Sequence, residues 1–234
     1  MSLPKLNAPT YEMEIPSTKE KVKYRPFLVK EQKMLMIAQE SQDPNMMANT
    51  MCDLIESCCE GVKGAEKMPT FDLEYMFLQL RAVSVGGDVE LEMLCQDDNE
   101  TKVPVTVKLD ELKVTELPNH KKEVMITDKI GMTFRYPSLV DVAKYSKDGM
   151  SNVDVTFGII QDCLVNIFDE NEVYEEHNKD ELQEFVEQMT TEQFEEVQGF
   201  FDTMPKVRHT VEVKNPNTGV VNQVHLEGMQ SFLG

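Results

Sequence analysis

The stretch MPTFDLEYMFLQLRAVSVGG, residues 68–87, is the most compact apolar block of the 234-residue sequence. It carries Asp72 and Glu74 near its start, where carboxylates interact favourably with the dipole of a helix. Thr70 stands where an N-cap residue is expected, and two glycines close the block. We therefore predict a helix over this stretch, capped by Thr70 and ended by Gly86-Gly87.

The apolar side chains of this predicted helix fall on two sides, with Phe71, Tyr75 and Leu78 on one and Leu73, Phe77 and Leu80 on the other. A helix that is apolar nearly all round is typically buried. We interpret it as the central core helix, with an interface to a partner as the alternative. Arg81 near its C-terminal end suits the helix dipole and is also a candidate contact for a partner's carboxylate.

The residues before this block predict a hairpin and two helices. YEMEI and KVKYRPFLV, within residues 11–29, are short extended runs joined by the turn-forming PSTKE. VKEQKMLMIAQES, residues 29–41, can place Val29, Met34, Ile37 and Ala38 on one helix face. Asp43-Pro44 can cap and start a second helix.

After Gly87 the pattern changes to the period of two that is typical of strands. DVELEMLC and KVPVTVKLDEL flank QDDNET, which predicts a β-hairpin. EVMITDKIGMTFRYP repeats the pattern around an Asp-Lys turn. KVRHTVEVK and VVNQVHLEG, joined by NPNTG, predict a third hairpin at the end of the chain.

Between the second and third of these hairpins the sequence predicts four helices. Their segments are SLVDVAKYS, VDVTFGIIQDCLVNIF, KDELQEFVEQM and TEQFEEVQGFFDTM. Many β-branched residues weaken the second assignment. In the fourth, Thr191 is the predicted N-cap, and Phe194, Val197, Phe200 and Phe201 form an apolar stripe.

The strands arrive as local pairs, which favours antiparallel pairing and an α+β fold. The predicted fold has a mainly helical middle with antiparallel β-hairpins at the N-terminus, the centre and the C-terminus. The polar loop at residues 146–152 is the best boundary. It divides an N-terminal α+β portion, residues 1–146, from acidic helices and a terminal hairpin, residues 147–234, unless the whole chain is one domain.

The formal net charge of −19 is unevenly distributed. Asp169–Asp202 holds 13 acidic side chains and one Lys, whereas residues 1–86 hold 12 acids and 10 bases. An acidic chain repels nucleic acid and anionic membranes, so neither is an expected partner. The acidic segment is either a solvated helical face or a docking surface for a basic partner, with Glu184, Glu187, Glu195 and Glu196 as the candidate contacts.

The composition is that of an ordinary globular protein, with neither a run of about 18 apolar residues nor a signal-peptide pattern. We expect it to be made in a cytosol. The odd number of cysteines, five, indicates buried reduced thiols. Cys58 and Cys59 are adjacent and lack the CxxC spacing of zinc ligands, while QDDNE and DENE lack the spacing of an EF-hand loop and suit turns.

The sequence contains none of the common motifs for nucleophilic catalysis. It contains no GxSxG, HExxH or glycine-rich phosphate loop. Structural roles are expected for the four histidines, of which His209 and His225 are candidates for pairing across the terminal hairpin. The basic run KEKVKYRP, residues 19–26, suits the solvated face of an edge strand or a contact for an acidic neighbour. We predict no catalytic residues, no metal and no cofactor.

Several segments nevertheless resemble a known family when taken in order. They are KYRPFLVKEQKMLMIAQES, FDLEYMFLQLRAVSVG, MTFRYPSLVDV, TTEQFEEVQGFFDTMPKVRHTVEVKNPNTG and HLEGMQSFLG. Together they resemble the baseplate hub protein family of T4-like contractile-tailed bacteriophages, over residues 11 to 234. The resemblance implies a late, structural tail protein of a myovirus, with other hub or tail proteins as partners, and it implies no catalytic residues.

Two classes of function follow. The first is a non-enzymatic tail protein that assembles the central baseplate hub in the host cytoplasm and resides in the virion baseplate, or a chaperone-like factor that leaves before the virion matures. The second is a thiol- or metal-dependent hydrolase that uses Cys58 or Cys59 with a distant histidine. The sequence leaves the oligomeric state open.

Overall fold

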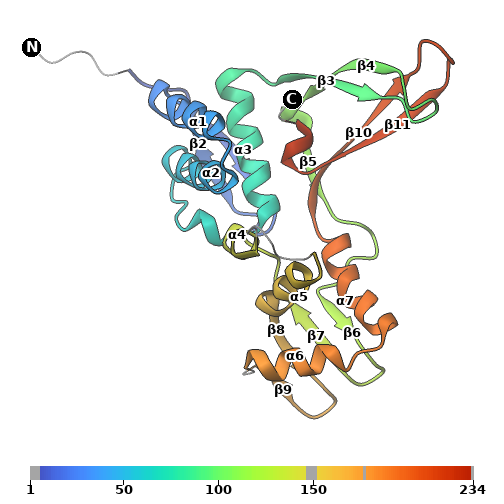
Figure 1. Ribbon diagram of the computed structural model, residues 1–234. Helices are drawn as coiled ribbons and strands as arrows, with labels where there is room; N and C mark the ends of the chain where they lie inside the picture. Colours follow the sequence, from blue (N-terminus) through green and yellow to red (C-terminus); the bar gives the residue numbers. More distant parts are fainter. Residues whose placement is uncertain (1–5, 146–151, 176–177, 233–234) are drawn as a thin grey trace, which may run out of the picture. The chain divides into compact units, whose positions relative to one another are not determined.

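A computed structural model describes residues 6–145, 152–175 and 178–232 (Figure 1). The chain divides into two compact units. The first unit comprises Met1–Thr115 and Lys206–Gly234, and the second unit comprises Glu116–Pro205, so the second is an insertion in the first. The predicted division between residues 146 and 147 lies outside the described residues and stays a prediction.

The first unit begins with the expected hairpin and helices. Strands β1 (Tyr11–Glu14) and β2 (Lys21–Tyr24) pair antiparallel, and helices α1 (Val29–Ser41), α2 (Pro44–Cys58) and α3 (Thr70–Val85) follow. The Asp43 carboxylate accepts a hydrogen bond from the N–H of Asn45 at 2.9 Å, as an N-cap does. The α+β class is confirmed.

Helix α3 is the core helix of the first unit, as predicted from its apolar faces. Phe71, Leu73, Met76, Phe77, Leu78 and Leu80 are each at most 2% exposed. The prediction of Thr70 as N-cap is wrong by one position, because the helix begins at Thr70 and the capping position is Pro69. No side chain caps this end.

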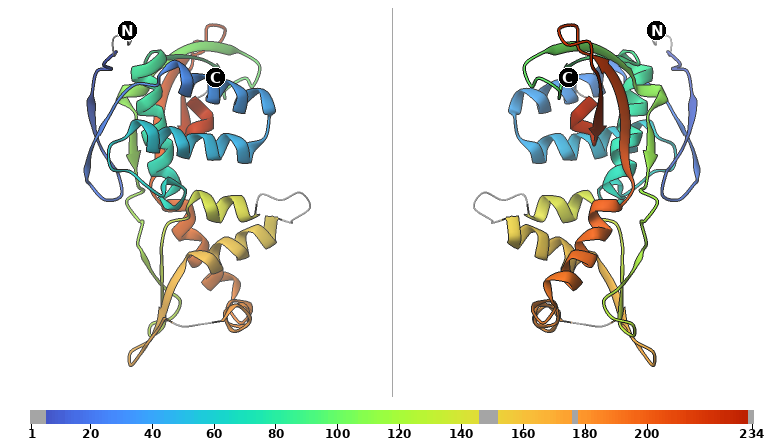
Figure 2. Two further views of the ribbon diagram at one scale, coloured as in Figure 1. Left: turned by 90° about the vertical axis from the view of Figure 1, so that its left-hand side faces the viewer. Right: turned by 90° about the vertical axis from the view of Figure 1, so that its right-hand side faces the viewer.

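Asp72 is not explained by the helix dipole alone, because its side chain is fully buried. Its carboxylate accepts a hydrogen bond from the N–H of Ser17 at 3.0 Å and another from the Ser17 hydroxyl. Ser17 lies in the turn between β1 and β2, and Figure 2 shows this hairpin beside α3 in both views. Burial raises the pKa of Asp72, whereas the bonds from Ser17 favour the ionised form. Asp72 therefore holds the first hairpin against the core helix.

Two further hairpins complete the first unit. Strand β3 (Asp88–Leu94) pairs with β4 (Lys102–Lys108), and β10 (Lys206–Lys214) pairs with β11 (Val221–Glu227) on one side and β5 (Lys113–Thr115) on the other. Both predicted hairpins are confirmed, while β5 was not predicted. One-turn 3-10 helices lie at Ala65–Lys67, Leu109–Glu111 and Met229–Phe232.

The tips of these two hairpins are joined by a polar network. The Asn215 side-chain amide donates to Asp98 Oδ2 at 2.8 Å, and the Asn222 amide donates to Asp97 Oδ1 at 2.8 Å. Asn222 Oδ1 accepts the N–H groups of Gln96 and Asp97, both at 3.0 Å. Loop chemistry therefore accounts for the acidic QDDNE segment, as the sequence indicated.

In its described residues, the second unit combines a four-stranded antiparallel sheet with four helices. The strand order is β6 (Glu123–Met125), β7 (Gly131–Phe134), β8 (Leu164–Phe168), β9 (Val173–Tyr174). The helices are α4 (Leu139–Tyr145), α5 (Asn152–Cys163), α6 (Lys179–Glu187) and α7 (Thr191–Thr203). The prediction of one helix through residue 168 is wrong, because Leu164–Phe168 forms β8, an inner strand of the sheet.

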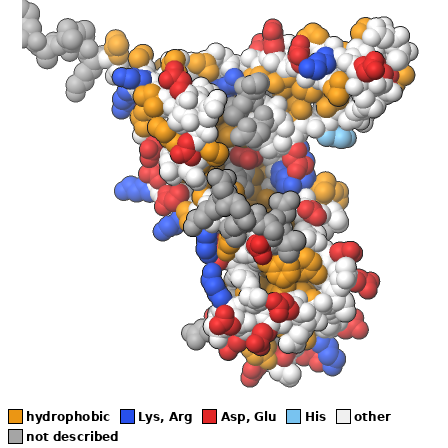
Figure 3. Space-filling view, in the orientation of Figure 1, with side chains coloured by type: hydrophobic (Ala, Val, Ile, Leu, Met, Phe, Trp, Pro, Cys, Tyr) orange, Lys and Arg blue, Asp and Glu red, His pale blue; other side chains and the backbone are white. Residues whose placement is uncertain are grey.

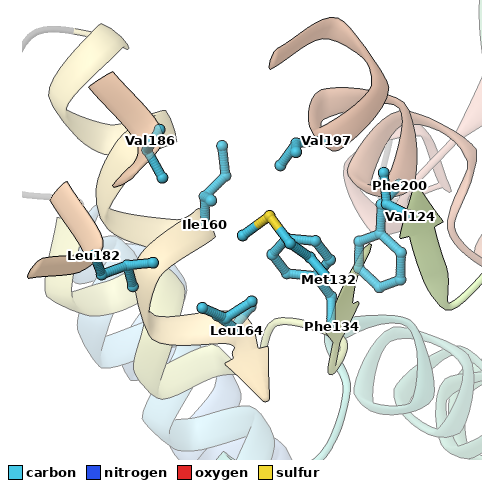
Figure 4. Close-up of a cluster of buried hydrophobic side chains, with 10 residues drawn as sticks. Val124, Met132, Phe134, Ile160, Leu164, Leu182, Val186, Val197 and Phe200 are labelled. Carbon is cyan, nitrogen blue, oxygen red and sulfur yellow. The ribbon is translucent and has the colours of Figure 1, made fainter. Parts of the chain in front are cut away.

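The core of the second unit joins the sheet to its helices (Figure 4). Val124, Met132, Phe134 and Leu164 come from strands, and Ile160, Cys163, Leu182, Val186, Val197 and Phe200 come from helices. The Phe134 and Phe200 rings lie 5.3 Å apart between centroids. The predicted stripe on α7 is confirmed, with Val197 and Phe200 buried. The cap of α7 is Thr190, one residue before the predicted Thr191.

An ion pair fixes the start of α4. Arg135 donates to both carboxylate oxygens of Asp141, at 2.6 and 2.8 Å, and the N–H and hydroxyl of Ser138 donate to the same group at 2.7 and 2.6 Å. Burial alone would raise the pKa of Asp141, but the bonds from Arg135 and Ser138 outweigh burial and lower that pKa to about 2.

We predict that Ser17→Ala lowers the free energy of unfolding by roughly 1.5–3 kcal/mol at pH 7, the contribution of a hydrogen bond to a buried charge. In an Asp72→Asn background the same change should cost less, because the acceptor is then uncharged. Urea unfolding followed by circular dichroism measures both. Equal losses in the two backgrounds would contradict the role assigned to Asp72.

We predict that Asp141→Asn destabilises the second unit only where Asp141 is ionised. A pKa lowered from 3.8 to about 2 corresponds to roughly 2 kcal/mol. This stability is present above about pH 4 and is lost as the pH falls toward 2, so the difference between wild type and variant should shrink over that interval. Urea unfolding at several pH values tests this, with the exposed Asp128→Asn as control. A pH-independent difference would argue against it.

Candidate partner-contact surfaces

The four glutamates predicted as contacts lie on the outer faces of α6 and α7. Leu182 and Val186 turn one side of α6 into the core, and Val197 and Phe200 do the same for α7. Residues about half a helical turn away point outward, and Glu184, Glu187, Glu195 and Glu196 are all exposed. We call these four side chains the acidic face.

The helices that carry the acidic face have well-defined starts. Asn178 with Glu181 and Thr190 with Gln193 form reciprocal capping boxes. The Asn178 side chain accepts the N–H of Glu181 at 2.8 Å, and the Gln193 side chain accepts the N–H of Thr190 at 2.9 Å. The acidic face is therefore presented on ordered helix starts.

The acidic face is not neutralised within the described part of the chain. Residues 116–205 contain 20 Asp and Glu and seven Lys and Arg, a net charge of −13. Among the described residues, none of the four glutamates lies within 4.0 Å of a Lys or Arg nitrogen, although Glu187 accepts a hydrogen bond from Gln183 at 2.8 Å. Figure 3 shows carboxylates gathered over the part of the second unit that holds α6 and the β8–β9 turn. Such a surface attracts a basic partner.

Arg81 has an internal role in the first unit. Its guanidinium donates to the carbonyl oxygen of Phe232 at 3.2 Å, which ties α3 to the 3-10 helix Met229–Phe232. Burial lowers the pKa of Arg81. In the described ranges no carboxylate pairs with it. Its contact with a partner stays a prediction.

Helix α1 presents an apolar surface that sequence reasoning missed. Only Glu31 and Ala38 of this helix are buried, while Val29 is 84% exposed and Met36 is 54% exposed. Of Val29, Met34, Ile37 and Ala38, which the sequence can place on one face, only Ala38 is buried. Figure 3 shows hydrophobic side chains exposed over α1. Exposed apolar helices are typical of surfaces that other proteins cover.

The cysteines lie in the interior, as expected. All five are free and buried. Burial raises the pKa of Cys58, and it raises that of Cys59 to about 12, so neither thiol favours the thiolate. Within residues 6–145, 152–175 and 178–232, no three His, Cys, Asp or Glu side chains are grouped to hold a metal ion.

Two of the described histidines, His120 and His225, take part in structural contacts. His120 Nδ1 lies 3.0 Å from Thr203 Oγ1, and its Nε2 lies 3.1 Å from the Tyr136 hydroxyl. Burial lowers the pKa of His120, which favours its neutral form. His225 Nδ1 lies 2.9 Å from Thr210 Oγ1. The pairing of His209 with His225 is wrong, since the register places His209 opposite Leu226.

Comparison with known proteins identifies one family. The family model described as T4 bacteriophage base plate protein matches residues 8–234. No curated protein and no solved structure matches the chain. Among the described helices, none is long and apolar enough to cross a membrane.

Proposed function

The chain belongs to the T4 bacteriophage base plate protein family, and from this we propose that it helps to assemble the central hub of the baseplate by binding other tail proteins. The match over residues 8–234 is the observation that carries the proposal, because it covers nearly the whole chain. The family gives the protein a structural role in the phage tail baseplate. The hub, the host cytoplasm as the site of assembly, and the absence of catalysis are parts of the proposal.

The acidic face supplies the contact in this proposal. Four exposed carboxylates without cationic partners among the described residues favour a basic partner and speed its association. The exposed apolar side chains of α1 offer a second, uncharged surface. Neither surface requires a reaction, which agrees with a protein that acts by binding.

Within the described ranges of the chain, the contacts of Cys58 and Cys59 do not favour the hydrolase alternative. Its nucleophile would be Cys58 or Cys59, and both thiols are 3% exposed. Their raised pKa values disfavour the thiolate that such a nucleophile needs. The binding role is therefore preferred.

We expect mass spectrometry to find this chain both in purified phage particles and in hub assembly intermediates. Retention in the particle follows if the protein is a permanent subunit. Detection in intermediates alone would instead support the chaperone-like factor that leaves before maturation. Absence from both would refute the proposal, and intermediates from a host infected by phage lacking this gene provide the control.

We predict that Glu184→Gln, Glu187→Gln, Glu195→Gln and Glu196→Gln together weaken binding to the hub subunit found in those intermediates by about tenfold at low salt. Each exposed charge contributes about 0.2–1 kcal/mol, and the loss should shrink as salt screens the remaining attraction. Binding is measured with purified proteins by calorimetry across a salt series.

The matched control for this experiment removes the same number of charges from the first unit. Glu12, Asp53, Glu60 and Glu90 are exposed and can be changed to the corresponding amides. This control should leave binding close to wild type. Equal binding by both variants at every salt concentration would leave the acidic face with a role in solubility only.

A further inference from the structure

A small apolar pocket opens on the second unit beside α6. It has a volume of about 300 Å³ and is lined by Ile130, Ile167, Phe168, Asp169, Tyr174 and Phe185. Ile167 and Phe185 also pack against the buried core of the unit, so the floor of the pocket is continuous with that core. A volume of this order accommodates a bulky apolar side chain.

The apolar wall of this pocket is held in place by close packing. A Cβ atom added at Gly131 would overlap the Phe168 ring, so this ring packs directly on the glycine backbone. Strand pairing places Gly131 opposite Phe168 in the register of β7 and β8. Gly131 therefore leaves room for the ring that forms one wall, and the pocket exists before any partner binds.

The rim of the pocket carries a fixed carboxylate. Asp169 accepts the N–H groups of Asn171 and Glu172 at 2.7 and 2.9 Å, and the Tyr174 hydroxyl donates to it at 3.1 Å. These bonds lower the pKa of Asp169 and orient its charge beside the apolar opening. The rim is thus anionic and needs no rearrangement to meet a cation.

One further carboxylate, that of Glu181, lies on the helix face that carries Phe185. Glu181 precedes Phe185 by four residues on α6, so the two side chains lie on the same helix face. Glu170, next to the rim, is paired with Lys129 at 3.0 Å, so these two charges offset each other and Asp169 is the charged group that lines the pocket. An apolar opening with the Asp169 carboxylate on its rim favours an occupant that carries both apolar bulk and positive charge.

We propose that this pocket binds a partner segment in which a bulky apolar side chain is followed by an arginine or lysine. The apolar side chain fills the space between Ile167 and Phe185, and the cation meets Asp169 at the rim. The inference rests on the proposed function, because it identifies what a basic tail protein would place on the second unit. The acidic face attracts a basic partner by its charge, and the pocket adds a binding site for one apolar side chain of that partner.

The test uses the full chain labelled with ¹⁵N and three blocked tetrapeptides, acetyl-Gly-Phe-Arg-Gly-amide, acetyl-Gly-Phe-Glu-Gly-amide and acetyl-Gly-Ala-Arg-Gly-amide. The Phe-Arg peptide should bind in the millimolar range and shift the amide signals of Ile130, Ile167 and Phe185. The Phe-Glu and Ala-Arg peptides should bind at least about threefold more weakly, as expected for the loss of a rim charge pair or of an apolar anchor. Equal binding of the three peptides, or shifts confined to other residues, would overturn the proposal.

Two variants locate the effect. Ile167→Trp fills the pocket and should abolish binding of the Phe-Arg peptide, whereas Val165→Trp, on the same strand but outside the pocket lining, should not. Asp169→Asn keeps an acceptor for the turn and should remove the preference for Phe-Arg over Phe-Glu. It also keeps the proposal testable if Ile167→Trp fails to fold. Retention of that preference in Asp169→Asn would contradict the role of the rim.

Binding of the hub subunit separates this proposal from the preceding one. If Ile167→Trp weakens association and the four acidic-face substitutions do not, the pocket stands and the acidic-face contact fails. If the acidic-face substitutions weaken association and Ile167→Trp matches Val165→Trp, the pocket is refuted while the proposed function stands.

Discussion

The antiparallel pairing of β5 with the first residues of β10 is the contact on which the arrangement of the chain depends. Thr115 lies opposite Lys206, and Val114 lies opposite Val207, so the chain leaves the first unit and returns to it at neighbouring positions. The 90 residues from Glu116 to Pro205, which form the second unit, are thus a long loop that starts and ends at these neighbouring positions. Closing a loop of this length costs only slightly more entropy than closing a loop half as long. The short pair of β5 and β10 therefore suffices to hold together the two points at which the chain passes between the units. Each unit has its own buried side chains.

Local patterns predicted the elements whose partners are close in sequence. The hairpins at QDDNET and NPNTG follow from alternating side chains and turn residues, and the apolar faces of residues 70–85 predicted a core helix. The pairing of β5 with β10 could not be predicted, because it joins segments about 90 residues apart and β5 has three residues. The end of α5 was missed because LVNIF continues the apolar run of the helix, and only sheet pairing distinguishes it.

The same holds for the surfaces. Features that depend on residues close in sequence could be predicted, and features that depend on distant residues could not. Helix periodicity places Glu184 and Glu195 opposite the buried positions of α6 and α7, so their exposure could be predicted. Asp72 was assigned to the helix dipole because its partner, Ser17, lies 55 residues away. The apolar pocket is assembled from two turns, two strands and a helix, and no single segment indicates it. The exposure of Val29 and Met36 depends on which side of α1 meets α2, which the composition of one helix does not specify.

The burial of the cysteines has a consequence for the life of a baseplate protein. A virion leaves the reducing interior of its host for an oxidising medium, where accessible thiols form mixed disulfides and cross-links. Exchange requires a thiolate that can be reached, and burial opposes both requirements at Cys52, Cys59 and Cys163, whose pKa values are raised to about 11 or 12. Under the proposed function, in which the protein is built into the virion inside the host, the fold allows the same covalent structure to persist in both redox environments.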